Sequence, residues 1–374
     1  MKILLAVNAP LTLSEAPPSR LIYIARSLKK EGFNVELVGQ KGERITHLKT
    51  TAIRGKKHLI NFVLILIIIK KMLAEAYSHL IIRGAHIAFF LLPLKIFNKK
   101  IIIDFHDWNF RQIKLYYRKT LYNKLKIIFY YITERLATKH SDLIICASKG
   151  LQFLLSDKER EKSMILENGL DLQEAKETIM KAMKNRDILF KTYGIRKSRP
   201  LAAFLGNWGM KLDMETMLEG CRKAGVNLIV VGEGPNIEKY KQNYKDVIFT
   251  GKLPRKKALK LISISDVAIA PYKDDKGKYE AFYYSTRKVK DYLSLGKPIL
   301  MADIKRREQF LIAYENVIFY RPGSPEDFAE KVKTMISDKK LREKMCKNNL
   351  KLAPRFDWQV LVKESRLVEK MKQL

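Results

Sequence analysis

Residues 1–39 read MKILLAVNAPLTLSEAPPSRLIYIARSLKKEGFNVELVG, and this stretch decides the fold class. Lys2–Asn8 has the short apolar composition of a strand, and Arg20–Lys30 carries apolar residues at helical spacing. Gly32 ends that helix, and Val35–Val38 is a second strand. A strand, a helix and a strand joined by short links form a βαβ unit, which predicts a parallel sheet.

The same alternation recurs along the chain and predicts two doubly wound α/β domains. Residues 171–198 are polar and rich in Lys, and we interpret them as a helix and the link between the domains. We expect a first domain over 1–194, a second over 195–355, and a helix over 356–374 that covers the flank of the second domain or returns to the first. Further strands are expected at Leu80–Ile82, Ile101–Asp104, Leu143–Cys146, Leu201–Leu205, Asn227–Val231, Val247–Thr250, Val267–Ala270, Pro298–Met301 and Asn316–Phe319.

Charge and composition narrow the function classes. The 374 residues carry a net charge of +33, which favours polyanionic partners such as phosphorylated substrates, anionic lipids or nucleic acid. A Lys-rich surface that serves solubility or heat stability is the alternative. The scattered residues Cys146, Cys221 and Cys346 indicate neither disulfides nor zinc, and favour a reducing compartment.

No segment of the chain predicts secretion or a membrane span. The N-terminus has no apolar segment followed by a cleavage site, so we expect a protein that is not secreted. The longest apolar run, Leu59–Ile69, is interrupted by Asn61 and is shorter than the ~20 residues that cross a bilayer.

The segment 283–299, YYSTRKVKDYLSLGKPI, carries the most specific chemistry. Ser285 and Thr286 open a helix, with Ser285 as the expected N-cap. Lys288 lies in the first turn, where free amide N–H groups and an ammonium suit a diphosphate. Asp291 follows one turn later, and its carboxylate can accept both hydroxyls of a ribose. The alternative is a surface ion pair between Lys288 and Asp291.

Three loops that follow strands of the second domain add candidate contacts to the same ligand. Glycines at a strand end let the backbone turn tightly near a phosphate, although a plain turn explains them equally well. Backbone groups of the third loop can pair with a base edge. The candidate residues are Gly206, Asn207 and Lys211 in GNWGMK, Gly232 and Glu233 in GEGP, and Lys252 and Leu253 in GKLP.

Taken together, these motifs resemble the nucleotide-binding half of GT-B glycosyltransferases, most of all the large group that uses GDP- or UDP-sugars. KVKDYLSLGKP is similar to the family pattern Lys-x-x-Glu-Tyr-x-x-x-Gly-Lys-Pro. The resemblance implies a fold of two Rossmann-like domains facing a cleft, Asp291 on the ribose and Lys288 near the phosphates. It implies a nucleotide-sugar donor, no required cofactor and no metal. The chain departs from the family at Tyr283, where an acidic residue is frequent, and at Asn207, where an Arg is usual.

In the first domain, Asp104-Phe105-His106-Asp107-Trp108-Asn109 follows a strand. His106 or Asp107 can orient or deprotonate an acceptor hydroxyl, and a structural role is the alternative. This run, together with Pro18-Ser19-Arg20 and Gly32-Phe33-Asn34-Val35, resembles mannosyltransferases that extend lipid-linked chitobiose. Those relatives have glycines where this chain has Pro17 and Pro18.

Residues 95–139 combine many cations with Tyr and Phe, which is typical of a helix that lies on an anionic membrane. A packed helix with a solvated basic face is the alternative. We expect the apolar residues at helical spacing in this segment to face the core: Ile113, Tyr117, Leu121, Leu125, Ile128, Ile132 and Leu136. The sequence shows no nucleic-acid-binding motif, so nucleic acid is not an expected partner.

The sequence therefore predicts a glycosyltransferase that moves a hexose, mannose or glucose favoured, to a lipid-linked or other membrane glycan. We expect it at the cytoplasmic face of the cell membrane, bound peripherally. A sugar-nucleotide epimerase on the same fold and a scaffold that binds polyanions or membranes are the alternatives.

Overall fold

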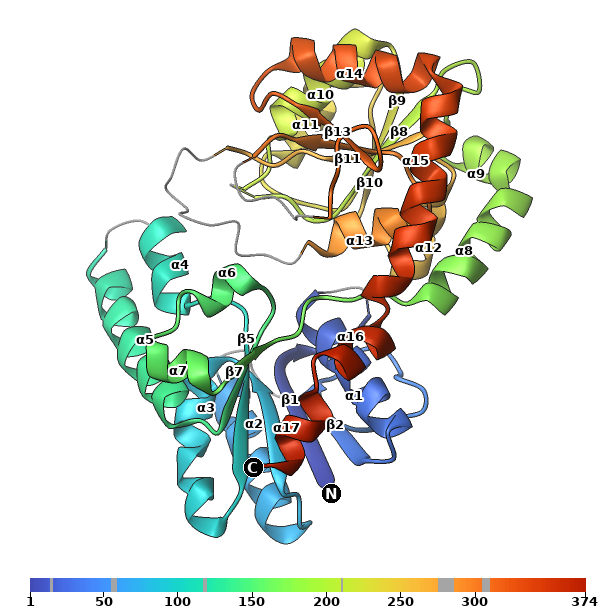
Figure 1. Ribbon diagram of the computed structural model, residues 1–374. Coiled ribbons are helices and arrows are strands. Elements are labelled where there is room, and N and C mark those ends of the chain that lie inside the picture. The colour runs from blue at the N-terminus through green and yellow to red at the C-terminus, as the bar shows by residue number, and fades with distance from the viewer. Residues whose placement is uncertain (14–15, 55–58, 117–119, 210, 275–285, 305–309) are drawn as a thin grey trace. The chain divides into compact units, whose positions relative to one another are not determined.

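Two separate parallel sheets organise the chain (Figure 1). The computed structural model describes residues 1–13, 16–54, 59–116, 120–209, 211–274, 286–304 and 310–374. They divide into two units. Unit 1 contains the described residues up to Asn168 together with Trp358–Leu374, and unit 2 contains those from Gly169 to Asp357.

In unit 1 the described strands pair in parallel in the order β3-β2-β1-β4-β5-β6-β7. The order reverses between β1 and β4, as in other doubly wound folds, and this reversal is the position where such sheets bind ligands. The strands are β1 (Lys2–Pro10), β2 (Asn34–Gln40), β3 (Lys49–Ile53), β4 (His79–Arg83), β5 (Lys100–Phe105), β6 (Leu143–Cys146) and β7 (Ser163–Ile165).

The helices of unit 1 connect these strands or return from the end of the chain. They are α1 (Ala16–Lys30), α2 (Ile60–Ala74), α3 (Ala85–Leu91), η1 (Leu92–Phe97), α4 (Asn109–Tyr116), α5 (Leu121–His140), α6 (Lys149–Gln152), α7 (Asp157–Glu161), α16 (Trp358–Glu364) and α17 (Leu367–Lys372). The C-terminal helices pack on unit 1: the rings of Tyr23 and Trp358 stack at 5.6 Å, and His79 Nε2 lies 2.9 Å from the Met371 carbonyl.

In unit 2 the described strands are also parallel, in the order β10-β9-β8-β11-β12-β13, with the reversal between β8 and β11. The strands are β8 (Leu201–Leu205), β9 (Asn227–Val231), β10 (Ile248–Gly251), β11 (Val267–Ala270), β12 (Ile299–Ala302) and β13 (Val317–Tyr320). The side chains of the other five strands are mostly buried because helices cover both faces, which explains their continuous apolar sequences, whereas those of the edge strand β10 are only partly buried.

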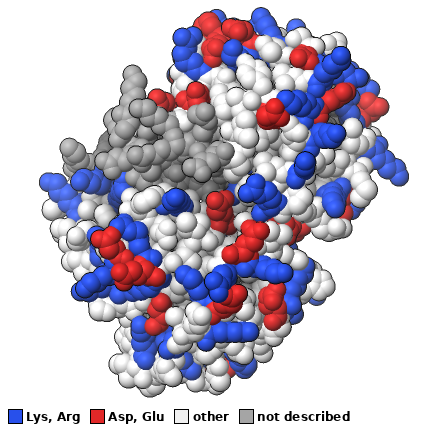
Figure 2. Space-filling model, in the orientation of Figure 1, with Lys and Arg blue, Asp and Glu red and all other residues white. Residues whose placement is uncertain are grey.

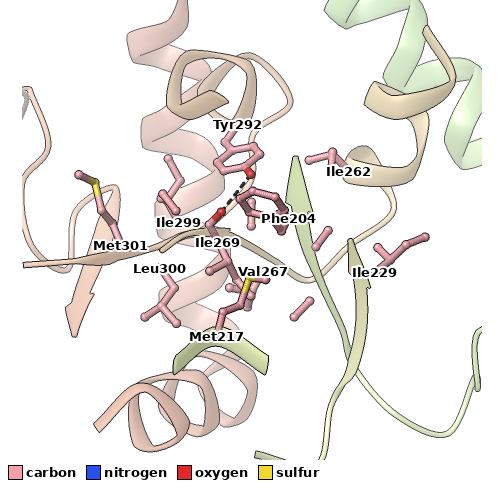
Figure 3. Packing of buried hydrophobic residues seen from close by; sticks show 14 of the residues in the cluster. Phe204, Met217, Ile229, Ile262, Val267, Ile269, Tyr292, Ile299, Leu300 and Met301 are labelled. Carbon is pink, nitrogen blue, oxygen red and sulfur yellow. Dashed lines mark hydrogen bonds between the residues drawn. The ribbon is translucent and has the colours of Figure 1, made fainter. Parts of the chain in front are cut away.

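The helices of unit 2 enclose a core that Figure 3 shows from close by. They are α8 (Leu172–Lys184), α9 (Arg186–Thr192), α10 (Met214–Ala224), α11 (Ile237–Asn243), α12 (Arg255–Ser263), α13 (Arg287–Ser294), α14 (Pro325–Ser337), α15 (Lys339–Leu352) and η2 (Ala353–Phe356). Helices α8 and α9, which the sequence analysis interpreted as the end of the first domain, group with unit 2 because α8 packs on α12 and α13.

Elements without a continuous apolar run escaped the sequence analysis. β3 and β7 lie at the two edges of their sheet, where short and partly polar strands are common. α11 was also missed, since its sequence IEKYKQN buries only Tyr240. Within the described part of the chain, no helix is both long and apolar enough to span a bilayer.

Candidate functional site

Three loops at the carboxyl ends of β8, β9 and β10 form one hydrogen-bonded network in unit 2. The Gly206 N–H donates to the Val231 carbonyl at 2.9 Å, and the Gly232 N–H donates to the Gly251 carbonyl at 3.0 Å. Asn207 Oδ1 accepts from the Glu233 N–H at 3.2 Å. The adjacent parallel strands thus bring together loops that lie about 20 residues apart in the sequence.

The remaining predicted residues of these loops lie in or beside this network. The Lys252 N–H donates to Glu233 Oε1 at 3.3 Å. Leu253 packs against the core of unit 2. The Lys211 carbonyl accepts from the N–H of Lys273, which follows β11, at 3.0 Å.

At two positions in these loops, neighbouring protein atoms leave room only for glycine. Gly232 has φ +142°, and a Cβ there would lie 2.2 Å from the Gly206 carbonyl oxygen. A Cβ on Gly234 would lie 2.5 Å from Trp208, whose indole N–H donates to the Pro235 carbonyl at 2.9 Å. The close approach of the loops therefore accounts for these glycines without a ligand.

The N-cap of helix α13 lies one residue later than the sequence predicted, while the expected first residue of the helix is confirmed. Arg287 is its first residue, and Thr286, with φ −75° and ψ 104°, is the N-cap in place of Ser285. Ser285 and Tyr283 lie outside the described residues. Ser and Thr are both good N-caps, so only the backbone conformation decides between adjacent candidates. Lys288 remains in the first turn.

The ammonium of Lys288 lies at the point where the strand order reverses. Nζ is 4.5 Å from the ring centroid of Phe204 on β8 and 5.2 Å from that of Tyr272, just after β11. A Cβ on Gly206 would lie 3.4 Å from the same Nζ. Desolvation by burial lowers the pKa of Lys288 to about 7. No hydrogen bond or ion pair to this ammonium is present among the described residues, so its cation is available to an anionic ligand.

Tyr292 fixes α13 to the sheet at the same position. Its hydroxyl accepts from the Leu205 N–H at 2.9 Å and donates to the Ile269 carbonyl at 3.0 Å, the second bond being drawn in Figure 3. One side chain thus joins the helix to the carboxyl ends of β8 and β11. This attachment sets the position of Lys288, one turn earlier on the same helix.

Asp291 is buried, and its partner is Arg255 at the start of α12. Arg255 Nη2 lies 2.8 Å from Asp291 Oδ1 and Nη1 lies 3.1 Å from Oδ2. The third contact of the guanidinium is Nε to Glu174 Oε2 at 2.7 Å. The sequence analysis missed both partners. Arg255 directly follows GKLP and opens a helix, where its charge opposes the helix dipole. That unfavourable position could have indicated that Arg255 pairs with a carboxylate. Nothing in the sequence pointed to Glu174.

In unit 1, a buried ion pair joins two of the motifs that carried the resemblance. Arg20 Nε on α1 lies 2.8 Å from Asp104 Oδ1 at the end of β5, and Arg83 Nη1 lies 3.5 Å from Oδ2. Arg20 also donates to the Leu166 carbonyl at 2.7 Å. Burial alone would raise the pKa of Asp104, but the charges of Arg20 and, more weakly, of Arg83 hold that pKa far below its usual value.

His106 lies beside this ion pair as a neutral imidazole. Its Nε2 is 3.2 Å from Asp104 Oδ2, but the atoms are not aligned for a hydrogen bond, and this buried nitrogen has no partner within the described structure. Burial and, next, the charge of Arg83 lower the pKa of His106 to about 3. Asp107 lies at the start of α4, where Oδ1 accepts from the Trp108 N–H at 2.8 Å and Oδ2 accepts from Gln112 Nε2 at 3.3 Å.

A second buried carboxylate lies near this loop, and the sequence analysis did not find it. Glu134 on α5 accepts from the backbone N–H of Asn109 at 3.2 Å and from that of Phe110 at 3.4 Å, at the start of α4. His86 Nδ1 is 4.0 Å away. Desolvation raises the pKa of Glu134 to about 7. Glu134 is the only acidic residue in the 20 residues of α5, and that isolation was the available signal.

The expected core face of α5 is on the surface, so that prediction was wrong. Leu121 is 74% exposed, Leu125 59% and Ile128 56%, and Ile132 and Leu136 are also exposed. Tyr117 lies outside the described residues. The residues of α5 that are buried are Thr133, Glu134, Ala137 and Thr138. Small and polar side chains therefore make the contacts of this helix, and the apolar spacing alone did not reveal which side they occupy.

Two further observations concern metal ions and cysteines. The described residues bring no three His, Cys, Asp or Glu side chains together in an arrangement that would hold a metal ion. Cys146 and Cys221 are buried and Cys346 is partly exposed, and all three are free thiols.

Comparisons with known proteins find a family model that matches a segment in the second half of the chain. Residues 185–352 match the family model of the glycosyl transferases group 1. An uncharacterized glycosyltransferase of Methanocaldococcus jannaschii is 24% identical over 298 residues, which are 75% of this chain and 71% of the relative. Neither match supports the epimerase or scaffold alternatives.

Solved structures with the same fold cover the whole chain. Anabaena HepE in complex with UDP has a TM-score of 0.70 at 16% identity and covers 100% of both chains. WaaG, a glycosyltransferase involved in lipopolysaccharide biosynthesis, has a TM-score of 0.71 at 14% identity and covers 98% of this chain and 99% of its own. At these identities the likeness shows the fold, which is GT-B.

Because Glu134 is buried, we expect the free energy of unfolding to depend on pH. Because its pKa is raised, the folded protein binds this proton more tightly than the unfolded chain. The resulting stabilisation is complete below about pH 4.5 and is lost as the pH rises through about 7. Urea unfolding of wild type between pH 5 and 8 should show a decline on the order of 3 kcal/mol that Glu134→Gln lacks.

The matched control is Glu161→Gln, which removes an exposed carboxylate of the same unit. It should decline with pH as wild type does. Parallel curves for wild type and Glu134→Gln would show that Glu134 does not titrate in this range.

Proposed function

We propose that this glycosyltransferase transfers a hexose, mannose or glucose favoured, from a GDP- or UDP-sugar to a hydroxyl of a lipid-linked or other membrane glycan. The match of residues 185–352 to the glycosyl transferases group 1 model and the likeness to solved GT-B structures support a sugar-transfer reaction. The main support for a nucleotide-sugar donor is the position of the Lys288 ammonium, which lies at the strand-order reversal of unit 2. It has no anionic partner among the described residues. HepE in complex with UDP supports a nucleotide donor on this fold.

In the proposed donor site, the diphosphate lies against Lys288, Gly206 and the first turn of α13. The amide N–H groups of that turn and the ammonium would stabilise the negative charge that develops on the leaving diphosphate. Asp291 takes the ribose hydroxyls, and the backbone at Lys252 and Leu253 faces the base. Lys211, Asn207, Gly232 and Glu233 complete the surrounding loops.

In unit 1, we assign the acceptor hydroxyl to His106 and Asp107. His106 is neutral at all physiological pH values, because its pKa of about 3 lies well below them. A neutral imidazole can accept a hydrogen bond from the hydroxyl and orient it, while so low a pKa makes it a weak base for full proton removal. Asp107, whose carboxylate accepts from the Trp108 N–H just before α4, is the second candidate to receive the proton.

The proposed membrane contact is the α5 face, which we define as Leu121, Leu125, Ile128, Ile132 and Leu136. Phe90 of α3 extends it, since its ring lies 6.5 Å from that of Phe129 on α5. The sole carboxylate of α5, Glu134, is buried, while Lys124 and Lys139 are exposed. Apolar side chains surrounded by cations, without exposed acids on the same helix, suit an anionic bilayer. We propose the cytoplasmic face of the cell membrane as the enzyme's location, and the α5 face supports the membrane contact.

Positive charge alone does not distinguish the α5 face from the rest of the surface. Figure 2 shows Lys and Arg side chains spread over both units on the side it displays, with groups of Asp and Glu between them. The net charge of +33 is therefore not gathered into one patch on that side. What supports a membrane role for α5 is the combination of cations with exposed apolar residues.

The donor site is tested by nucleotide binding. A thermal-shift screen with UDP, GDP and their glucose and mannose conjugates should single out one nucleotide, because stabilisation grows as RT ln(1 + [L]/Kd). Free Lys288 is mostly neutral at pH 8, and a bound diphosphate raises its pKa. Calorimetry at pH 8 in buffers of different ionisation enthalpy should therefore show uptake of close to one proton, and affinity should fall as the pH rises above about 7.

Lys288→Met should lower the affinity on the order of tenfold or more and abolish the proton uptake. Lys245→Met, which removes an exposed cation of the same unit, should change neither. Absence of stabilisation by all of these nucleotides in wild type would reject the proposed donor.

The acceptor assignment is tested by transfer of labelled sugar from the selected donor into a lipid extract of the source cells. His106→Ala should lower kcat on the order of 100-fold while leaving the Kd of the donor nucleotide unchanged. The rate of the wild-type enzyme should show no acidic limb from His106 between pH 5 and 8, because its pKa is about 3. A full rate in His106→Ala would rule out this role.

The membrane contact is tested by flotation with vesicles of phosphatidylglycerol and of phosphatidylcholine. Wild type should bind the anionic vesicles more tightly, at ~1 kcal/mol for each cation near the surface. Leu125→Glu/Ile128→Glu should lose on the order of tenfold in binding. Ile188→Glu, a substitution of an exposed apolar residue on unit 2, should bind as wild type does. Equal binding by all three proteins, or self-association through α5 without vesicle binding, would refute the proposal.

A further inference from the structure

The carboxylate of Asp291 is held by a chain of buried charges that joins three helices of unit 2. Glu174 on α8 contacts Arg255 Nε at 2.7 Å, and the two terminal nitrogens of Arg255 contact the two oxygens of Asp291 at 2.8 and 3.1 Å. The side chains of Glu174, Arg255 and Asp291 are at most 10% exposed. Arg287 Nε, at 3.9 Å from Asp291 Oδ2, is a more distant neighbour.

The geometry of this pairing leaves the carboxylate able to accept more hydrogen bonds. An ionised carboxylate offers about four lone-pair positions on its two oxygens. A guanidinium that donates one N–H to each oxygen uses one position on each and fixes the plane of the carboxylate. One position remains on each oxygen, which matches the two adjacent hydroxyls of a ribose.

The position of Arg255 in the chain connects it with the donor site. It directly follows Gly251-Lys252-Leu253-Pro254, the loop assigned to the base, and it is the first residue of α12. The same residue therefore ends the base loop and orients the carboxylate assigned to the ribose. Glu174 accepts from the Nε–H of the guanidinium, so that the guanidinium cannot rotate freely.

We propose that Arg255 is a positioning residue for ribose recognition: with Glu174 it fixes the Asp291 carboxylate so that one free lone pair on each oxygen faces the 2′- and 3′-hydroxyls of the donor nucleotide. The inference rests on the proposed donor site. It predicts that selection for the 2′-hydroxyl depends on Arg255, although Arg255 itself touches no part of the ribose.

The test compares UDP with 2′-deoxy-UDP and GDP with 2′-deoxy-GDP by calorimetry on the full chain. Wild type should bind the ribonucleotide that it accepts about tenfold or more tightly than the deoxy form, since the lost hydrogen bond is to a charged group. Arg255→Lys keeps the charge but loses the planar fork. It should weaken the binding of the ribonucleotide more than that of the deoxy nucleotide, which has only its 3′-hydroxyl to lose, and so bring the ratio close to one.

Two further variants separate positioning from general damage to the fold. Glu174→Gln should reduce the ratio partly, because it weakens the hold on Arg255 without removing it. Arg222→Lys makes the same substitution in an exposed ion pair of unit 2 and should leave the ratio unchanged. A structural role alone would lower the melting temperature and weaken both nucleotides equally, so an unchanged ratio in Arg255→Lys would overturn the inference.

The remaining outcomes separate this inference from the proposed function. Binding of neither UDP nor GDP by wild type would reject the donor site itself. Wild-type binding without discrimination against the deoxy nucleotide would leave the donor site in place and would contradict the ribose role of Asp291, and with it the role of Arg255.

Discussion

Parallel pairing of the strands is the constraint on which both candidate sites depend. In a parallel sheet every strand ends at the same edge, so loops distant in the sequence meet there. In unit 2 this brings Gly206, Gly232 and Gly251 into one network and places Lys288 beside Phe204. In unit 1 it brings Arg83 and Asp104 together at the ends of neighbouring strands. The chemistry of each unit lies at the edge that its topology creates.

Both units hold a buried carboxylate near that edge by an arginine from another element. Asp104 is paired with Arg20 of α1, and Asp291 with Arg255 of α12. Burying such charges is costly unless they are paired, and removal of one partner from a buried pair typically costs 3–5 kcal/mol. The pairs therefore contribute little net stability compared with apolar packing, but they fix the carboxylate in one orientation. That orientation is what a binding or catalytic site requires.

Burial also determines the protonation of the groups that face the proposed substrates. It lowers the pKa of Lys288 to about 7 and that of His106 to about 3, and it raises the pKa of Glu134 to about 7. An anionic ligand would restore the charge of Lys288, while His106 stays neutral. The α5 face is a departure from the burial of apolar groups, because leucine and isoleucine side chains are exposed there on a basic helix. A lipid surface would remove those apolar side chains from contact with water, which is energetically favourable.

The sequence by itself determined the fold class and most elements of both sheets, because strands buried on both faces are continuous apolar runs ended by glycine or polar residues. It also indicated the helix that we propose for donor binding, since Ser-Thr-Arg-Lys-Val-Lys-Asp places a cap, a cation and a carboxylate within two turns. Tertiary structure alone decided that Thr286 is the cap, that Gly232 is required by the Gly206 carbonyl, and that Arg255 and Glu174 hold Asp291. It also decided that α5 packs through Thr133 and Ala137 and exposes its leucines. Local patterns report which residues share one helix or strand, whereas contacts such as those of Arg255 with Asp291 and Glu174, 36 and 81 positions away, arise only when the sheets form.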